Sequence, residues 1–150
     1  MAVVDPIKSM VTLLENKWKP SLTDNEKPHI TSVTDQKVVN FNLNHDWILI
    51  FRSDPLSQDG GLGSLSKNVF NRFKIDVRTS GSRGGSETHW RKIVDEVQRI
   101  LDDNITNPTS DWDEFTILKP DGDDRDLSDK SINVWRMLMP RELQKLNKTR

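Results

Sequence analysis

The sequence contains no cysteine. This absence excludes disulfide scaffolds, thiol nucleophiles and zinc sites built on cysteine. Hydrophobic residues are also few, because they make up 33% of the 150 residues, below the usual share for a compact domain. Five Trp and five Phe nevertheless supply large side chains for a core. We therefore expect one domain with a modest core, stabilised by packing or by assembly with other chains.

Long apolar runs are absent as well. No stretch approaches the roughly 20 consecutive apolar residues that a membrane-spanning helix needs. The N-terminal segment Met1–Pro6 lacks the basic and apolar regions of a secretory signal. We expect a protein that is made in the cytosol and has no membrane partner.

Charge is nearly balanced in total and strongly segregated along the chain. The net formal charge is −1, yet residues 67–99 carry +4, residues 100–129 carry −8 and residues 130–150 carry +5. Segments of opposite sign can fold against each other or present complementary faces to neighbouring copies. An unevenly charged, solvated surface is the simpler interpretation.

Two amphipathic helices are predicted. Apolar residues at helical spacing indicate a first helix over residues 6–18, ended by Pro20, and a second from Ser86 to about residue 103. Alternating or continuous apolar residues predict strands at 39–44, 47–51, 72–78, 115–118 and 132–139. The run at 47–51 is apolar at every position, which suits a central strand covered on both faces or a strand with one face in a subunit contact. A Gly/Ser-rich loop is expected at 54–66 and an acidic turn at 121–124.

This order of elements predicts an α+β fold. It comprises an N-terminal helix, a mixed and mostly antiparallel sheet of four to five strands, and a second helix packed on one sheet face, with both helices on the same face. The predicted domain spans residues 1–139, and residues 140–150 form a basic C-terminal tail.

Catalytic chemistry has little support in the sequence. The only candidates for acid–base work near neutral pH are His29, His45 and His89, and none lies beside a Ser or a carboxylate at a recognisable catalytic spacing. We expect His89 to be exposed or packed. The glycines at 60–63 lack the Lys-Ser/Thr ending of a phosphate-binding loop, whereas the segment 80–86 with Arg83 precedes a helix and is a weak anion-site candidate.

Metal-dependent chemistry is similarly weak. The acidic turn offers carboxylates between residues 121 and 129, but its glycine stands at the second position of the loop and no closing Glu follows, so it fails the pattern of a calcium loop. Asp35-Gln36-Lys37 superficially resembles the end of a nuclease motif without a suitable upstream acid. No enzyme activity, cofactor or metal is predicted.

Nucleic-acid binding is the main alternative class. Arg72, Lys74 and Arg78 lie on one face of a predicted strand, and the tail adds Arg141, Lys145, Lys148 and Arg150. Clustered positive charge of this kind binds phosphates. The strand face lacks the interleaved aromatic residues that stack on single-stranded bases, and charge pairing with a neighbouring subunit would use the same residues.

A family resemblance enters at residues 70–104. The strand Phe73–Ser80, a short Gly/Ser/Arg linker and the helical run Trp90–Leu101 resemble the strand-to-helix signature of tail terminator and tail-completion (neck) proteins of tailed bacterial or archaeal viruses. The resemblance is close over this unit and loose over most of the chain. It implies a non-enzymatic virion protein, made in the host cytoplasm, that assembles as a ring of typically six copies at the head-proximal end of the tail tube.

The implied partners are other copies of the chain, the tail tube protein and a neck or head-completion protein, with DNA passing through the lumen without specific recognition. A neighbouring head–tail connector position is the alternative, because the glycine-rich loop and basic tail depart from the family pattern. A heterologous ring requires two different, complementary patches on each subunit. The residues predicted to contact subunits or partners are Trp47, Leu62, Arg72, Lys74, Arg78, Arg83, Asp123, Asp124, Trp135, Met137, Arg141 and Lys145.

Overall fold

The predicted α+β class is confirmed. The computed structural model describes residues 6–33, 46–52, 68–80, 86–106, 116–129, 131 and 134–146. Its elements, in chain order, are α1 (Pro6–Lys17), the short helix η1 (Pro20–Leu22), β1 (His29–Val33), β2 (Trp47–Arg52), β3 (Asn68–Ser80), α2 (Ser86–Asp103), β4 (Thr116–Pro120), β5 (Arg125–Asp126) and β6 (Val134–Leu146).

The sheet is mixed and mostly antiparallel, as predicted. Its strand order is β1-β2-β3-β6-β4, and β5 pairs separately with β6. Only the β1–β2 pair is parallel among the described strands. Six strands are described, where four to five were predicted, because β1 and the two-residue β5 were missed. The β1 sequence alternates Ile30 with the more exposed His29 and Thr31, a pattern too short and polar to predict a strand. The predicted strand at 39–44 lies outside the described residues.

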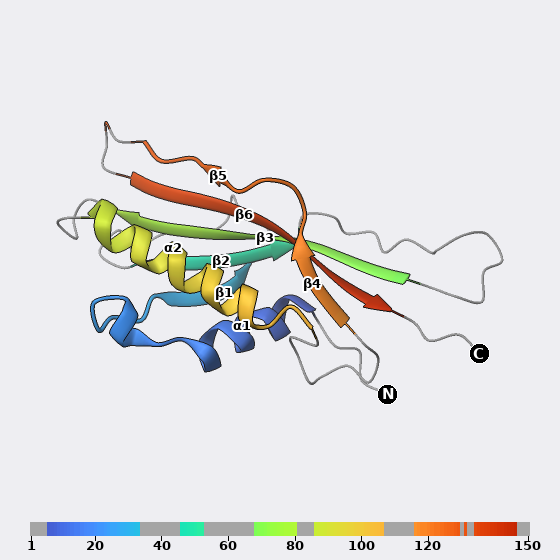
Figure 1. Ribbon diagram of the computed structural model, residues 1–150. Coiled ribbons are helices and arrows are strands. Elements are labelled where there is room, and N and C mark those ends of the chain that lie inside the picture. The colour runs from blue at the N-terminus through green and yellow to red at the C-terminus, as the bar shows by residue number, and fades with distance from the viewer. Residues whose placement is uncertain are drawn as a thin grey trace.

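Both helices pack on one face of the sheet. Helix α1 contacts β1 and β2, whereas α2 contacts β3 and β6, and Figure 1 shows α2 lying across the sheet. The register places Ile50, Ile75 and Met139 side by side across three strands, and all three are fully buried. The apolar stripes of both helices share this core, and the members that line it are Ile7, Met10, Leu14, Trp18, Trp90, Ile93, Val97 and Ile100.

The opposite sheet face is partly buried too. Leu49 lies between Thr31 on β1 and Asp76 on β3 in the strand register, and both Leu49 and Asp76 are fully buried. Since Ile48 and Ile50 are also fully buried from the helix side, β2 is covered on both faces. This confirms the interpretation of its unbroken apolar run.

Strand β6 extends beyond its predicted end at residue 139. It runs to Leu146 and pairs with β3 over its whole length, so the predicted boundary between residues 139 and 140 falls inside a strand. Proline is tolerated at position 140 because β5 pairs with residues 137–138 and β4 with residues 141–145, which leaves the missing N–H at the gap between them. Arg141 and Leu143 beyond it are buried.

Candidate functional site

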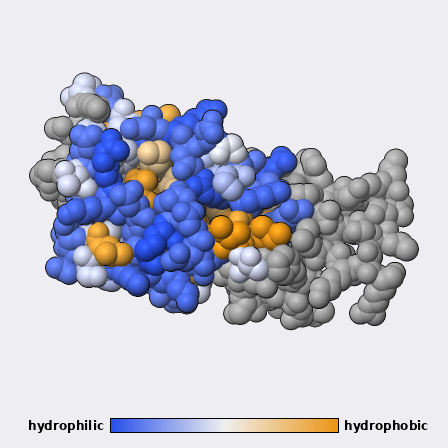
Figure 2. Space-filling model, in the orientation of Figure 1, coloured by the Kyte–Doolittle hydropathy of each residue, from blue (hydrophilic) through white to orange (hydrophobic). Residues whose placement is uncertain are grey.

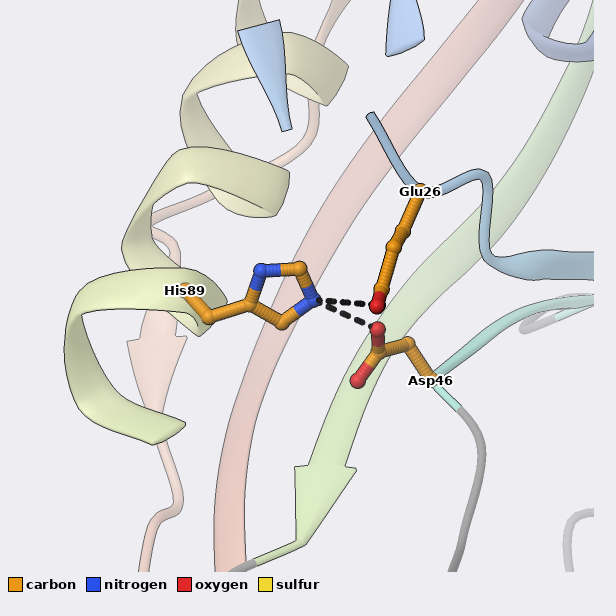
Figure 3. A group of neighbouring side chains, drawn as sticks. All are labelled: Glu26, Asp46 and His89. Carbon is orange, nitrogen blue, oxygen red and sulfur yellow. Dashed lines mark hydrogen bonds and ion pairs between the residues drawn. The ribbon is translucent and has the colours of Figure 1, made fainter. Parts of the chain in front are cut away.

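Three carboxylates gather around the imidazole of His89. His89 lies in the first turn of α2, Asp24 and Glu26 lie in the turn after η1, and Asp46 immediately precedes β2. The Nδ1 atom is 2.8 Å from Asp24 Oδ2, and the Nε2 atom is 2.7 Å from Asp46 Oδ2 and 3.5 Å from Glu26 Oε2. Figure 3 shows the ring of His89 directed at Glu26 and Asp46. We call Asp24, Glu26, Asp46 and His89 the His89 cluster.

The turn that carries Asp24 is held in an unusual backbone conformation. Asp24 and Asn25 have φ angles of 56° and 60°, the left-handed region that Asp and Asn tolerate better than other side chains do. The Asn25 N–H donates to Pro20 O at 2.8 Å, and the Thr23 hydroxyl donates to Glu26 O at 2.6 Å. Trp18 Nε1 in turn donates to the Thr23 hydroxyl at 3.2 Å. The turn is therefore anchored to the end of α1, and its carboxylates face α2.

Asp24 and Asp46 each accept a further hydrogen bond from a residue outside the cluster. Lys92 Nζ donates to Asp24 Oδ1 at 2.6 Å. Hydrogen bonds from Lys92 and then His89 hold the pKa of Asp24 below its ordinary value. The Thr79 hydroxyl on β3 donates to Asp46 Oδ1. Asp46 is 5% exposed and His89 is 9% exposed, so the inner part of the cluster is shielded from water.

The arrangement is suited to holding segments together more than to catalysis. Both ring nitrogens of His89 face carboxylates, and only a doubly protonated imidazole donates at both positions. The Thr79 hydroxyl is committed to Asp46 and does not bond to the ring. Among the described residues no nucleophile is aligned with His89, which a catalytic dyad would require.

Sequence reasoning missed this cluster because its members come from distant segments. His89 is separated from Asp46 by 43 residues and from Asp24 by 65. Of the two states predicted for His89, exposed or packed, the structure shows the packed one, but the carboxylate partners were not foreseen. His29 is exposed and stacks on Trp47, with ring centroids 4.9 Å apart. His45 lies outside the described residues.

Several predicted contact residues make their contacts within the chain. Trp135 is 9% exposed and packs against Trp90, with ring centroids 5.8 Å apart. Arg141 is 4% exposed and binds Asp124, with Nη1 2.5 Å from Oδ1. Contacts of Trp135 and Arg141 with a neighbouring subunit would therefore require access to buried side chains.

The three residues of the predicted basic strand face do share one face of β3, and part of their positive charge is paired with carboxylates. Arg72, Lys74 and Arg78 are alternate residues of β3 and share the face opposite the helices. Arg78 binds Asp76 through Nε at 2.9 Å and Nη2 at 2.7 Å. Arg72 Nε lies 4.0 Å from Asp121 Oδ1. Arg136 on β6 binds the same carboxylate, with Nη2 3.0 Å from Asp76 Oδ2, so this one acid is shared by two arginines.

The acidic turn follows the same pattern. Besides the Asp124–Arg141 pair, Asp126 accepts from the backbone N–H of Ser128 at 2.9 Å, and Asp129 accepts from that of Ser131 at 3.1 Å. Thus these three carboxylates of the acidic segment bind residues of their own chain, one of them an arginine and the other two backbone N–H groups. Asp123 is exposed, and Trp47 and Met137 are partly exposed. Leu62 and Arg83 lie outside the described residues, as does the side chain of Lys145.

Exposed apolar surface is scattered. Figure 2 shows small, separated hydrophobic patches on a mostly hydrophilic face. Within the part of the chain that the structure describes, the large exposed hydrophobic residues are Leu22, Ile105 and Leu127. A shallow hollow between α2 and β6 is lined by Trp90, Arg91, Val94, Asp95 and Met137.

Comparison with protein-family models and with curated proteins gives no match. Within the described residues, no helix is long and apolar enough to cross a membrane. The function must therefore be argued from the fold and from the geometry of these residues.

Proposed function

We propose that this protein is a virion structural protein similar to tail terminators, which assembles as a ring at the end of a tail tube and joins the tube to the neck or head. The observation that carries the proposal is a stretch of β3 that no described strand pairs with on the side of β2. Strand β2 pairs with β3 only from Phe73 to Arg78. Residues 68–72 of β3 therefore have β6 as their one neighbour among the described strands.

The direction of the backbone groups along this edge follows from Pro140. Its carbonyl accepts from the Asp121 N–H at 3.2 Å and hence points away from β3. In an antiparallel ladder the N–H and C=O of one residue point to the same side. The Lys74–Pro140 pair is therefore a non-hydrogen-bonded pair, and the even-numbered residues of β3, including Phe70, direct their backbone groups away from β6.

An edge of this kind supports assembly by strand addition. Exposed N–H and C=O groups form a template on which a strand of another chain can pair. Figure 1 shows this end of β3 and β6 extending past the helices. A ring also needs a second, different patch, and the hollow that includes Met137 offers apolar contact away from this edge.

The nucleic-acid alternative is less well supported. On its three-residue basic face, Arg78 binds Asp76 and Arg72 Nε lies 4.0 Å from Asp121 Oδ1. These contacts compensate part of the positive charge on which phosphate affinity depends. No specific observation among the described residues favours it over the ring.

The test is the oligomeric state of the full chain. We expect native mass spectrometry and negative-stain microscopy at high micromolar concentration to show rings of uniform copy number, either alone or after addition of tail tube protein. Phe70→Pro removes an outward N–H and should reduce ring formation at least about tenfold, because each lost intersubunit hydrogen bond weakens every contact in the ring.

The matched control is Phe70→Val, which also removes the aromatic ring but keeps the N–H. Circular dichroism would establish that both variants keep their strands. A chain that stays monomeric in every condition contradicts the proposal. Salt-dependent binding of labelled DNA by that monomer, weakened by Arg72→Ala with Lys74→Ala, would favour the nucleic-acid alternative.

A further inference from the structure

Part of the His89 cluster has the composition of a metal site. We propose that Glu26, Asp46 and His89 bind a divalent transition cation, with Zn²⁺ the best match. One ligand atom from each of these residues lies within 4.8 Å of the others. The inference is independent of the ring proposal, because it concerns the opposite end of the fold from the β3 edge (Figure 1).

Two of the three donor separations can be compared with those around a bound ion. Zinc lies about 2.0–2.2 Å from imidazole nitrogen and carboxylate oxygen, so tetrahedral donors stand about 3.3 Å apart. The His89 Nε2–Glu26 Oε2 distance of 3.5 Å already matches. The His89 Nε2–Asp46 Oδ2 distance is 2.7 Å and must open by about 0.6 Å. Glu26 has a side chain that is 46% exposed, so it can adjust and admits the ion from solvent.

The surrounding groups orient the ligands as they do around bound metals. Metal-binding histidines usually donate their second ring N–H to a carboxylate, which sets the tautomer. Asp24 occupies this position at Nδ1, at 2.8 Å, and is itself held by Lys92 at 2.6 Å. The Thr79 hydroxyl holds the second oxygen of Asp46. With Nδ1 directed at Asp24, Nε2 is the ring nitrogen that faces Asp46 and Glu26.

The chemistry of the donors selects the class of cation. One imidazole nitrogen and two carboxylates suit zinc and neighbouring transition ions, whereas Ca²⁺ takes six to eight oxygen ligands and Mg²⁺ prefers oxygen and retains water. A cation and a proton compete for the same lone pair of Nε2, so binding should weaken as the pH falls. The bound ion would join the turn after η1, the start of β2 and the first turn of α2.

The experiment is a titration of the full, chelator-treated chain with zinc chloride. Isothermal titration calorimetry should show saturable binding of one ion, and ¹H–¹⁵N spectra of the imidazoles should show a shift of the Nε2 resonance of His89. We expect His89→Gln to weaken binding by at least about 100-fold and Glu26→Gln by at least about tenfold. Asp24→Asn, which alters only the orienting carboxylate, should weaken it about 10–100-fold.

Two matched controls should bind as the unmodified chain does. Glu15→Gln makes the same chemical change at an exposed carboxylate on α1, and His29→Gln removes an exposed imidazole on β1. The proposal is overturned by absent binding at millimolar zinc, or by binding that Glu26→Gln and His89→Gln leave unchanged. Because Glu26 lies at the rim, its variant decides the question even if His89→Gln fails to fold.

Discussion

At the scale of single residues, Asp76 is the most constrained charge. Arg78 and Arg136 stand directly opposite each other on β3 and β6, where like charges repel. The fully buried carboxylate of Asp76 binds both, with Arg78 Nη2 at 2.7 Å and Arg136 Nη2 at 3.0 Å. The basic face predicted from the sequence is thus organised by an acid that the alternation pattern treated as one more polar position.

Replacing Asp76 should destabilise the fold. Asp76→Asn leaves two arginines beside each other without their buried counter-charge, so we expect a loss of about 3 kcal/mol in the free energy of unfolding. Urea denaturation followed by tryptophan fluorescence would measure it. Glu87→Gln, which breaks the exposed pair with Arg91, is the control and should cost less than about 0.5 kcal/mol. Equal effects of the two changes would contradict this account.

At the scale of elements, a buried carboxylate joins the two helical regions. Glu96 on α2 is 2% exposed. It accepts from the backbone N–H of Lys19, just before η1, at 2.8 Å and from Arg99 Nε at 2.6 Å. Arg99 Nη2 also donates to Lys17 O at 3.0 Å. Because these bonds satisfy groups at the end of α1, they fix the position of α1 on α2.

Glu96→Gln should loosen this junction. The amide keeps the shape of the side chain but loses its charge, so we expect a loss of about 1–3 kcal/mol in unfolding free energy. Hydrogen exchange should show faster exchange of the Lys19 amide than in the unmodified chain. Asp95→Asn, at the neighbouring exposed position of α2, is the control. Unchanged protection at Lys19 would show that Glu96 does not hold the junction.

At the scale of the whole molecule, the fold depends on the second half of β6. Its residues 141–145 pair with β4, and residues 140–146 pair with β3. Leu143 is fully buried and Arg141 nearly so. A chain that ends at residue 139, the predicted domain boundary, would leave β4 without its partner strand and expose the core beside Leu118.

Truncation after Met139 should therefore abolish the cooperative thermal transition seen by circular dichroism. Truncation after Leu146 removes basic residues as well but keeps every described strand, so its midpoint should stay within a few degrees of the full chain's. A cooperative thermal transition for residues 1–139 would contradict this expectation and support the predicted domain boundary after residue 139. The comparison separates the contribution of strand pairing from that of the tail's charge.

Much of the architecture could be predicted from the local pattern of apolar residues. The helices Pro6–Lys17 and Ser86–Asp103 and the strand around Ile75 repeat apolar residues at regular intervals, because burial of one face imposes that spacing. The strand around Ile48 was recognised instead from its unbroken apolar run. The α+β class follows from the same patterns. Strand β1 and the end of β6 were not predicted because their buried positions are few or are polar, as at Arg141.

The sequence by itself determined the two helices, the strands around Ile48 and Ile75, and the buried positions of these elements. Only the tertiary structure decided which charges meet. Asp24, Glu26 and Asp46 reach His89 because the turn after η1 and the start of β2 arrive at the first turn of α2, and Arg141 meets Asp124 because β6 continues past Pro140. The periodicity of apolar residues indicates which face of a single segment is buried. A site depends on the distances between side chains of different segments, and these are set by how the sheet and helices pack.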